Sequence, residues 1–197
     1  LGDRYGVGPE LVARRLAEPA PEGCIFVVLG DPQVLARGAE VAGVVVGLPH
    51  VDATDVHGER SCLVPMAPNL PLEDAARPTR AAGEEMLAVL DAASRLVRDG
   101  RVDALVYAPL NKQAMASAGH AAGDELDFLA GRFGHPRPLG EINVLGDIWT
   151  SRVTSHVPIS RVAEGITRDS VAAAIRLLHD RQVRAGIRPR LAVAALN

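Results

Sequence analysis

The 197-residue sequence contains only two cysteines, no long hydrophobic run and no excess of positive charge. Cys24 and Cys62 have neither the spacing of a zinc site nor that of a disulfide framework, so we expect a reducing, cytoplasmic compartment. No apolar run approaches the roughly 20 residues that span a bilayer, and no signal peptide is visible. The net charge of −3 argues against a nucleic-acid-binding surface. Neither a membrane nor a nucleic acid is therefore an expected partner.

What the chain does contain is typical of a globular α/β protein. Apolar residues make up 48% of it and charged residues 23%. Predicted strands alternate with predicted helices, which favours mainly parallel sheets with flanking helices. The chain has no initiator methionine and ends directly after a predicted strand at Asn197. We therefore expect residues to be missing before it and the fold to continue after it.

The stretch from Val102 to Ala108 is the clearest candidate for a central strand. It is largely apolar, and Gly100 closes the helix predicted before it, which is typical of a strand buried on both faces. Pro109 has no backbone N–H and would end the hydrogen-bond ladder. Asn111 and Lys112 follow at the carboxyl end, the edge at which open α/β sheets bind ligands, so both are candidates for substrate contacts. An ordinary surface turn is the alternative.

Caps and hydrophobic periodicity predict the remaining elements. Asp31 and Thr79 are expected to cap helices, and the helix after Thr79 has a clear apolar stripe. The glycine-rich segment 2–10 is either an anion-binding turn or a plain tight turn that leads into a helix at Pro9. Asp124, Ser160 and Thr167 are further possible caps, Lys112–Ala118 a short helix, and segments 24–29, 44–46, 141–145, 150–154 and 191–196 predicted strands.

Three motifs that occur in order resemble the PdxA family. Gly2–Glu10 is similar to the family's opening Gly-Asp-Pro-Ala-Gly-Ile-Gly-Pro-Glu, and Ala108–Lys112 to its Ala-Pro-(Ile/Leu)-Asn-Lys. Thr154–Ile159 is similar to its Thr-Thr-His-Ile-Pro-Leu. The resemblance covers nearly the whole chain, and the order of the motifs makes it more specific than any single one.

The resemblance implies a fold, an activity and an assembly. The fold would be like that of isocitrate and isopropylmalate dehydrogenases, with two domains around a cleft, here parts 1–120 and 121–197. The enzyme would oxidise a β-hydroxy acid with NAD or NADP and a divalent metal (Zn, Mg, Co or Mn), with decarboxylation of the product as an option. It would form a homodimer. The resemblance names no residue of this chain as the catalytic one.

His156 matches the first of the three metal-binding histidines of the family. A neutral imidazole at the end of a strand suits a divalent ion, which polarises an alcohol as a Lewis acid. The family's other two metal histidines, and most of its nicotinamide contacts, correspond to positions after Asn197. Without the resemblance, a structural or surface role for His156 would be the simpler interpretation.

One departure from the family pattern bears on the substrate. The family carries the motif Gly-His-Thr-Glu-Phe-Leu, and its last three residues align with Asp127-Phe128-Leu129 of this chain. Counting back from there, Leu126 takes the Thr position and Glu125 the His position. A one-residue insertion would put Asp124 at the His position instead. A carboxylate there disfavours a phosphorylated substrate by charge repulsion. The alternative is that the acidic residues only cap their helix.

Three other functions remain in view. Some PdxA-like proteins oxidise dihydrodiol carboxylates from aromatic breakdown, and that substrate class is one option here. A phosphotransacetylase-like acyl or phosphoryl transferase shares the broad fold but uses neither NAD nor the three histidines. An inactive paralogue would fold without binding NAD or metal. Binding of NAD and a metal distinguishes the dehydrogenase from the last two.

Overall fold

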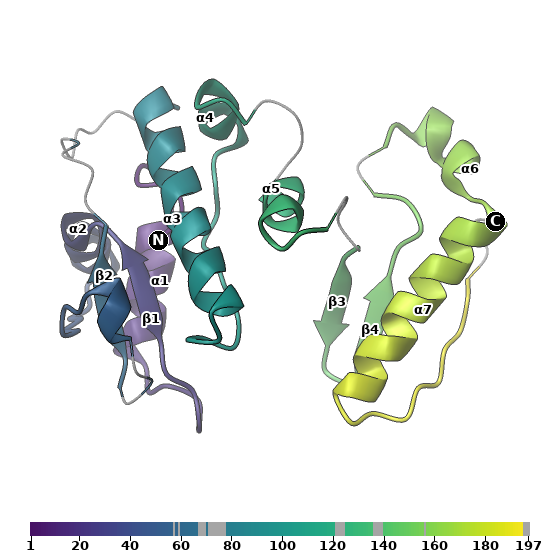
Figure 1. Ribbon diagram of the computed structural model, residues 1–197, viewed down its shortest axis with the longest axis horizontal. Coiled ribbons are helices and arrows are strands. Elements are labelled where there is room, and N and C mark those ends of the chain that lie inside the picture. Colours follow the sequence, from purple (N-terminus) through teal and green to yellow (C-terminus); the bar gives the residue numbers. More distant parts are fainter. Residues whose placement is uncertain are drawn as a thin grey trace. The chain divides into compact units, whose positions relative to one another are not determined.

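The computed structural model describes residues 1–56, 58, 60–66, 70, 78–120, 125–135, 140–155 and 157–194. The chain forms two compact units, Leu1–Arg137 and Pro138–Asn197 (Figure 1). No helix in the described ranges combines the length and the apolar character that crossing a bilayer requires.

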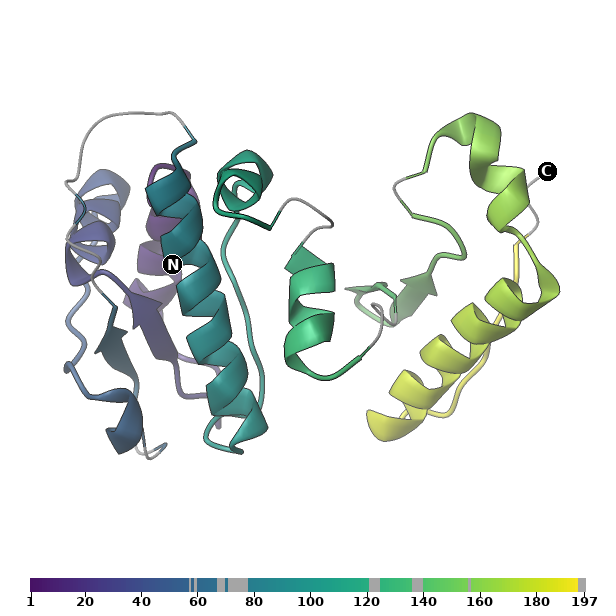
Figure 2. The same ribbon diagram turned by 45° about the horizontal axis from the view of Figure 1, so that its top comes forward.

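The first unit is built on two parallel strands, β1 (Val27–Gly30) and β2 (Cys62–Pro65). Helices α1 (Gly8–Ala17) and α2 (Pro32–Ala42) pack against one face of this sheet, and α3 (Arg80–Arg98) packs against the other (Figures 1 and 2). A short 3-10 turn, η1 (Ala53–Asp55), lies between α2 and β2. The unit is therefore an α/β arrangement of three layers.

The alternation of side chains along the strands produces these layers. Val28 lies opposite Leu63 in the strand register, and both pack among the residues of α1 and α2. Leu29 lies opposite Val64, and both pack against α3 through Ala93. Successive residues of a strand point to opposite faces, so two neighbouring apolar pairs supply both faces of the sheet.

Two predicted helix caps of this unit are confirmed. The Asp31 carboxylate accepts a hydrogen bond from the Gln33 amide at 2.8 Å, and the Thr79 hydroxyl accepts one from the Ala82 amide at 3.1 Å. Gly43 ends α2 in the left-handed conformation, with φ of 66°, as expected of a C-terminal glycine. These contacts are local, so the sequence is sufficient to predict them.

The predicted apolar stripe of α3 is confirmed in most positions. Met86 and Leu90 are each only 2% exposed and contact α4 (Lys112–Ser117) through Ala114 and Met115. Towards its end the helix buries Leu96, while the predicted position, Val97, is half-buried. The stripe thus joins α3 to the short helix that carries the candidate site.

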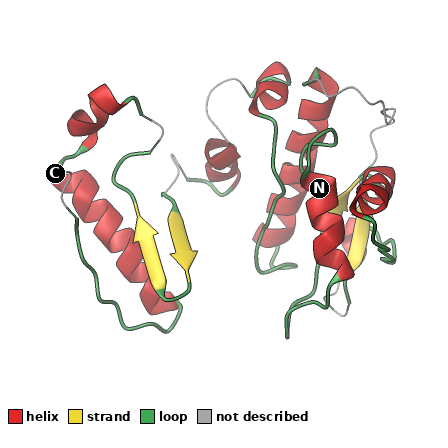
Figure 3. Ribbon diagram, turned by 180° about the vertical axis from the view of Figure 1, so that it is seen from behind, coloured by secondary structure: helices red, strands yellow, loops and turns green. Residues whose placement is uncertain are grey.

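The central strand predicted at 102–108 is wrong. The segment is a loop between α3 and α4 (Figure 3), and one side of it packs on the core through Val102 and Leu105. The other side is open, with Val106 92% exposed. An extended segment becomes a strand only when a neighbour pairs with its backbone. Nothing in the described part of the chain pairs with these residues as a strand.

Two other predicted strands are also wrong. Residues 44–46 are irregular, and Val45 is 93% exposed while its neighbours pack on α1 and α2. Residues 191–194 are irregular too, and Val193 is 64% exposed; residues 195–197 lie outside the described ranges. Both segments are short and apolar, a pattern that does not determine whether a strand finds a partner.

The second unit contains a β-hairpin and a long helix. Strands β3 (Ile142–Leu145) and β4 (Ile148–Ser151) are antiparallel, unlike the parallel pairing predicted for most of the chain. A two-residue turn with Gly146 at φ of 56° joins them, and so short a connection permits only antiparallel pairing. Helix α7 (Arg168–Arg184) lies beside β4 (Figure 1).

The caps of the second unit are predicted in part. The Thr167 hydroxyl accepts a hydrogen bond from the Ser170 amide at 3.1 Å in a capping box that begins α7. Ser160 is not a cap; it lies inside the 3-10 turn η2 (Ile159–Arg161), and α6 (Val162–Gly165) follows directly. Because η2 continues directly into α6, no helix begins immediately after Ser160.

Candidate functional site

The candidate site begins where the loop after α3 enters α4. The Asn111 side chain caps this helix, because its Oδ1 accepts a hydrogen bond from the Ala114 amide at 3.1 Å. This bond leaves the side-chain nitrogen and the second lone pair of Oδ1 for a substrate contact. Lys112 is the first residue of α4, and its side chain is 61% exposed.

The structure brings Lys112 together with another predicted site residue. Lys112 Nζ lies 3.8 Å from Oε2 of Glu125, the first residue of α5 (Glu125–Arg132). The Glu125 side chain is 24% exposed, and its Oε2 is buried with no hydrogen-bond partner among the described residues. Leu126, the next residue, is half-buried in α5. A cation and a carboxylate thus meet at the beginnings of two successive helices.

His156 and Asp124 lie outside the described residues, so their predicted roles stay predictions. Within the described ranges, no group of three histidine, cysteine, aspartate or glutamate residues is arranged to hold a metal ion. The predicted metal site is therefore not provided by these residues alone.

The position of α4 depends on a close approach to α3 at Gly83. A Cβ atom at this position would lie 2.0 Å from the Ala114 carbonyl oxygen and 2.9 Å from the Ala118 side chain. Both distances are far below van der Waals contact. Glycine is required here because the backbones of the two helices touch.

We expect the Gly83→Ala variant to lower the free energy of unfolding by about 1–3 kcal/mol, because the new methyl group overpacks the contact between α3 and α4. Gly131→Ala in α5 is the matched control. Nothing lies within 4 Å of its added Cβ, so it should raise stability by roughly 0.5–1 kcal/mol. Urea unfolding of the two variants measures both effects. Equal stabilities for Gly83→Ala and the wild type would contradict the close contact.

A second polar cluster of the first unit is not expected from the sequence. The Arg4 guanidinium lies 2.9 Å from Glu85 Oε2 and 3.2 Å from Asp31 Oδ2, and all three side chains are at least 93% buried. Arg4 Nη2 also donates to the Leu70 carbonyl at 3.2 Å. The only signal is Arg4 itself, a charged residue where the resembled motif has proline.

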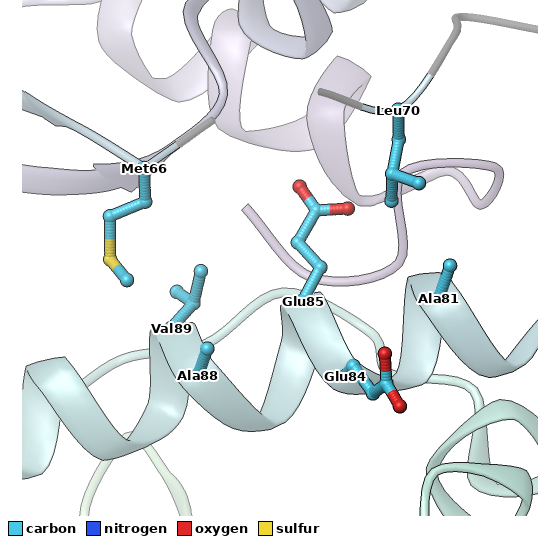
Figure 4. A pocket seen from close by; sticks show the side chains of 7 residues that line it. All are labelled: Met66, Leu70, Ala81, Glu84, Glu85, Ala88 and Val89. Carbon is cyan, nitrogen blue, oxygen red and sulfur yellow. The ribbon is translucent and has the colours of Figure 1, made fainter. Parts of the chain in front are cut away.

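Burial dominates the electrostatics of this cluster. It raises the pKa of the Glu85 carboxyl, and the neighbouring Arg4 guanidinium opposes that rise. Figure 4 shows the Glu85 side chain extending from α3 towards a cavity of about 440 Å³, lined also by Met66, Leu70 and Val89. The Glu85 carboxyl therefore holds its proton to a higher pH than an exposed glutamate does.

This arrangement predicts a pH dependence of stability. A carboxyl with a raised pKa in the folded state contributes stability that is present below its unfolded pKa and is lost as the pH rises through the folded pKa. Glu85→Gln has no such titration. We therefore expect this variant to gain stability relative to the wild type as the pH rises from about 4 to 8. Urea unfolding across this range measures the difference, and a constant difference would contradict the raised pKa.

The hydrogen bonds of the glycine-rich turn before α1 favour a plain turn over an anion site. The Asp3 amide donates to the Pro109 carbonyl, and the Gly6 amide donates to the Asp3 carbonyl, both at 3.0 Å. The Tyr5 amide donates to the Asp3 carboxylate at 3.1 Å. These N–H groups are used within the chain, so they are not directed at a ligand.

Comparison with known proteins gives a consistent result. The family model described as "Pyridoxal phosphate biosynthetic protein PdxA" matches residues 22–197. A Pseudomonas aeruginosa protein provisionally named 4-hydroxythreonine-4-phosphate dehydrogenase 2 is 38% identical over the whole chain. The D-threonate 4-phosphate dehydrogenase of Bordetella bronchiseptica is 30% identical over 90% of it. The chain spans 60% and 52% of the lengths of these two relatives.

A solved structure agrees with this relationship. The crystal structure of a 4-hydroxythreonine-4-phosphate dehydrogenase from Burkholderia phymatum is 28% identical and superposes with a TM-score of 0.74, covering 96% of this chain and 58% of that one. The resemblance read from the motifs is thereby confirmed. The chain belongs to the PdxA family.

Proposed function

We propose that the whole protein is an NAD(P)-dependent, divalent-metal-assisted dehydrogenase that oxidises the alcohol of a β-hydroxy acid, with a substrate site altered from that of 4-hydroxythreonine-4-phosphate dehydrogenases. The match to the PdxA family over residues 22–197 carries this proposal. The relatives named above are dehydrogenases, which supports the same reaction class. Lys112 and Glu125 are the described residues that we assign to the substrate, with Asn111 and Leu126 beside them.

The proposed metal ligand of this chain is His156. The described residues do not by themselves hold a divalent ion, so further ligands would come from elsewhere in the whole protein. Zn, Mg, Co and Mn are all candidates, and NAD and NADP are both candidates for the cofactor. We also propose the homodimer and the isocitrate-dehydrogenase-like pair of domains, in parts 1–120 and 121–197, that the resemblance implies.

A dihydrodiol carboxylate is the second candidate substrate. The observation in its favour is the ion pair of Lys112 with Glu125 at 3.8 Å, because the paired lysine offers no net positive charge to a phosphate group. Membership of the PdxA family favours a dehydrogenase over an acyl or phosphoryl transferase. An inactive paralogue differs from the proposal by its failure to bind cofactor.

Calorimetry on the full-length protein tests the proposal. We expect NAD or NADP to bind, and one of the four metals to bind to protein first stripped with a chelator. A folded protein that binds neither nicotinamide nor metal would contradict the dehydrogenase and favour the inactive paralogue.

A further inference from the structure

The cavity beside α3 lies at the end of the sheet where parallel strands bind ligands. Strands β1 and β2 are parallel and end at Gly30 and Pro65, and Met66, the residue after β2, lines the cavity. In open α/β sheets, ligands bind at the carboxyl ends of the strands. The volume of about 440 Å³ falls within the range of about 300–1,000 Å³ that is usual for small-molecule sites. The cavity therefore has the place and the size of a ligand site.

The wall of this cavity is mainly apolar. Helix α3 and the segment after β2 supply its five apolar lining residues, which Figure 4 shows: Ala81, Ala88, Val89, Met66 and Leu70. The other two described lining residues are Glu84 and Glu85. An ionised carboxylate only accepts hydrogen bonds, so a polar ligand has to bring the donor.

Glu85 is the carboxylate that offers an oxygen to the cavity. The Glu84 side chain is 52% exposed and is paired with Arg80 at 2.8 Å. The Glu85 side chain is only 7% exposed, and its Oε2 accepts from Arg4 Nη1 at 2.9 Å. Its Oε1 accepts no hydrogen bond from the described residues and is not one of their solvent-shielded, unpartnered atoms. Oε1 is therefore accessible from the cavity towards which the side chain extends (Figure 4).

The charges around Glu85 favour a positively charged donor. Arg4 forms ion pairs with both Asp31 and Glu85. The Leu1 amino group also interacts electrostatically with Glu85, and burial lowers the pKa of this amino group. Burial still raises the pKa of the Glu85 carboxyl in the presence of both groups. A cation that donates to Oε1 would therefore stabilise the ionised carboxylate, and more strongly than a neutral donor would.

We propose that this cavity binds a small organic cation, an amine with an apolar body, whose ammonium group donates to Glu85 Oε1 while its hydrocarbon part packs against Met66 and Val89. An anion would be repelled by the carboxylates, and a purely apolar ligand would exclude water from Oε1 without replacing its hydrogen bond. None of the lining residues is assigned to the hydroxy-acid substrate, so this site goes beyond the proposed function.

The first test titrates the full-length protein with n-butylammonium and with n-butanol, its matched neutral analogue, and follows binding by nuclear magnetic resonance. We expect butylammonium to bind at least about 10-fold more tightly than butanol, because its hydrogen bond to Oε1 is charged on both sides. Glu85→Gln should abolish this preference and leave the affinity for butanol unchanged. Glu40→Gln is the matched control, since it removes an exposed carboxylate of α2 that does not line the cavity.

Equal affinities of the wild type for butylammonium and butanol would overturn the proposal. An undiminished preference in a folded Glu85→Gln variant would overturn it too. So would an equal loss of the preference in Glu40→Gln, because the effect would then be one of net charge. Butylammonium binding needs neither NAD nor metal nor turnover, so this test can fail while the proposed dehydrogenase holds, and the reverse.

A second variant tests the cavity without changing a charge. Ala88 lines the cavity and is exposed on α3, so Ala88→Leu adds volume there without overpacking the core. We expect it to weaken the binding of butylammonium by about 10-fold, because the leucine would occupy space that the butyl chain needs. Ala36→Leu on the exposed side of α2 is the matched control and should bind like the wild type. Unchanged binding in Ala88→Leu would overturn the cavity as the site.

Discussion

The Arg4→Met variant is expected to unfold with a free energy about 3–5 kcal/mol lower than that of the wild type. Methionine keeps the hydrocarbon volume but removes the guanidinium that forms ion pairs with both Asp31 and Glu85. Both carboxylates would remain buried without this ion-pair partner. Breaking a buried ion pair from one side is costly because the remaining charge cannot return to water.

Arg80→Met is the matched control for Arg4. It breaks the Arg80–Glu84 pair, which is 2.8 Å long but has side chains 75% and 52% exposed. An exposed pair contributes little, so we expect a loss of less than about 1 kcal/mol. Urea unfolding of both variants gives the comparison. Similar losses would contradict the buried cluster as a main support of the first unit.

The His156→Ala variant of the full-length protein is expected to lose at least about 100-fold of its metal-dependent turnover. Changes in the outer shell of a metal site already cost about 10- to 100-fold, and removal of a direct ligand should cost no less. Metal affinity, measured by calorimetry, should fall with the turnover. The expectation follows from the family motif, since His156 lies outside the described residues.

His179→Ala is the control for this change. His179 lies in α7 next to Asp180, and its side chain is 52% exposed. Neither metal affinity nor turnover should change. Wild-type metal affinity in His156→Ala would contradict the assignment of this histidine and return it to a structural or surface role.

The parts of the fold that the sequence predicts well are local. The caps at Asp31 and Thr79 join atoms two or three residues apart, and the α3 stripe depends on helical spacing alone. The strand at 102–108 is wrong because its pairing depends on distant segments. Its composition fits a strand, but no described neighbour supplies the ladder.

The sequence identifies individual residues of the candidate site, but it does not predict which of them contact one another. Lys112 and Glu125 are each identified from their motifs, yet their contact depends on how α4 and α5 are placed after the loop. The buried ion pairs of Arg4 are harder still to predict from the sequence. Its partners Asp31 and Glu85 lie 27 and 81 residues away along the chain, and neither has a motif that points to an arginine.

The most direct test of the account is NAD(P)H formation by the full-length protein from a panel of β-hydroxy acids. Each acid is offered free and as its phosphate ester, after metal removal and again after metal is restored. We predict that at least one hydroxy acid is oxidised, that oxidation stops without metal, and that it returns with metal. A folded protein that oxidises none of them with any of the four metals and either cofactor would contradict the proposed dehydrogenase.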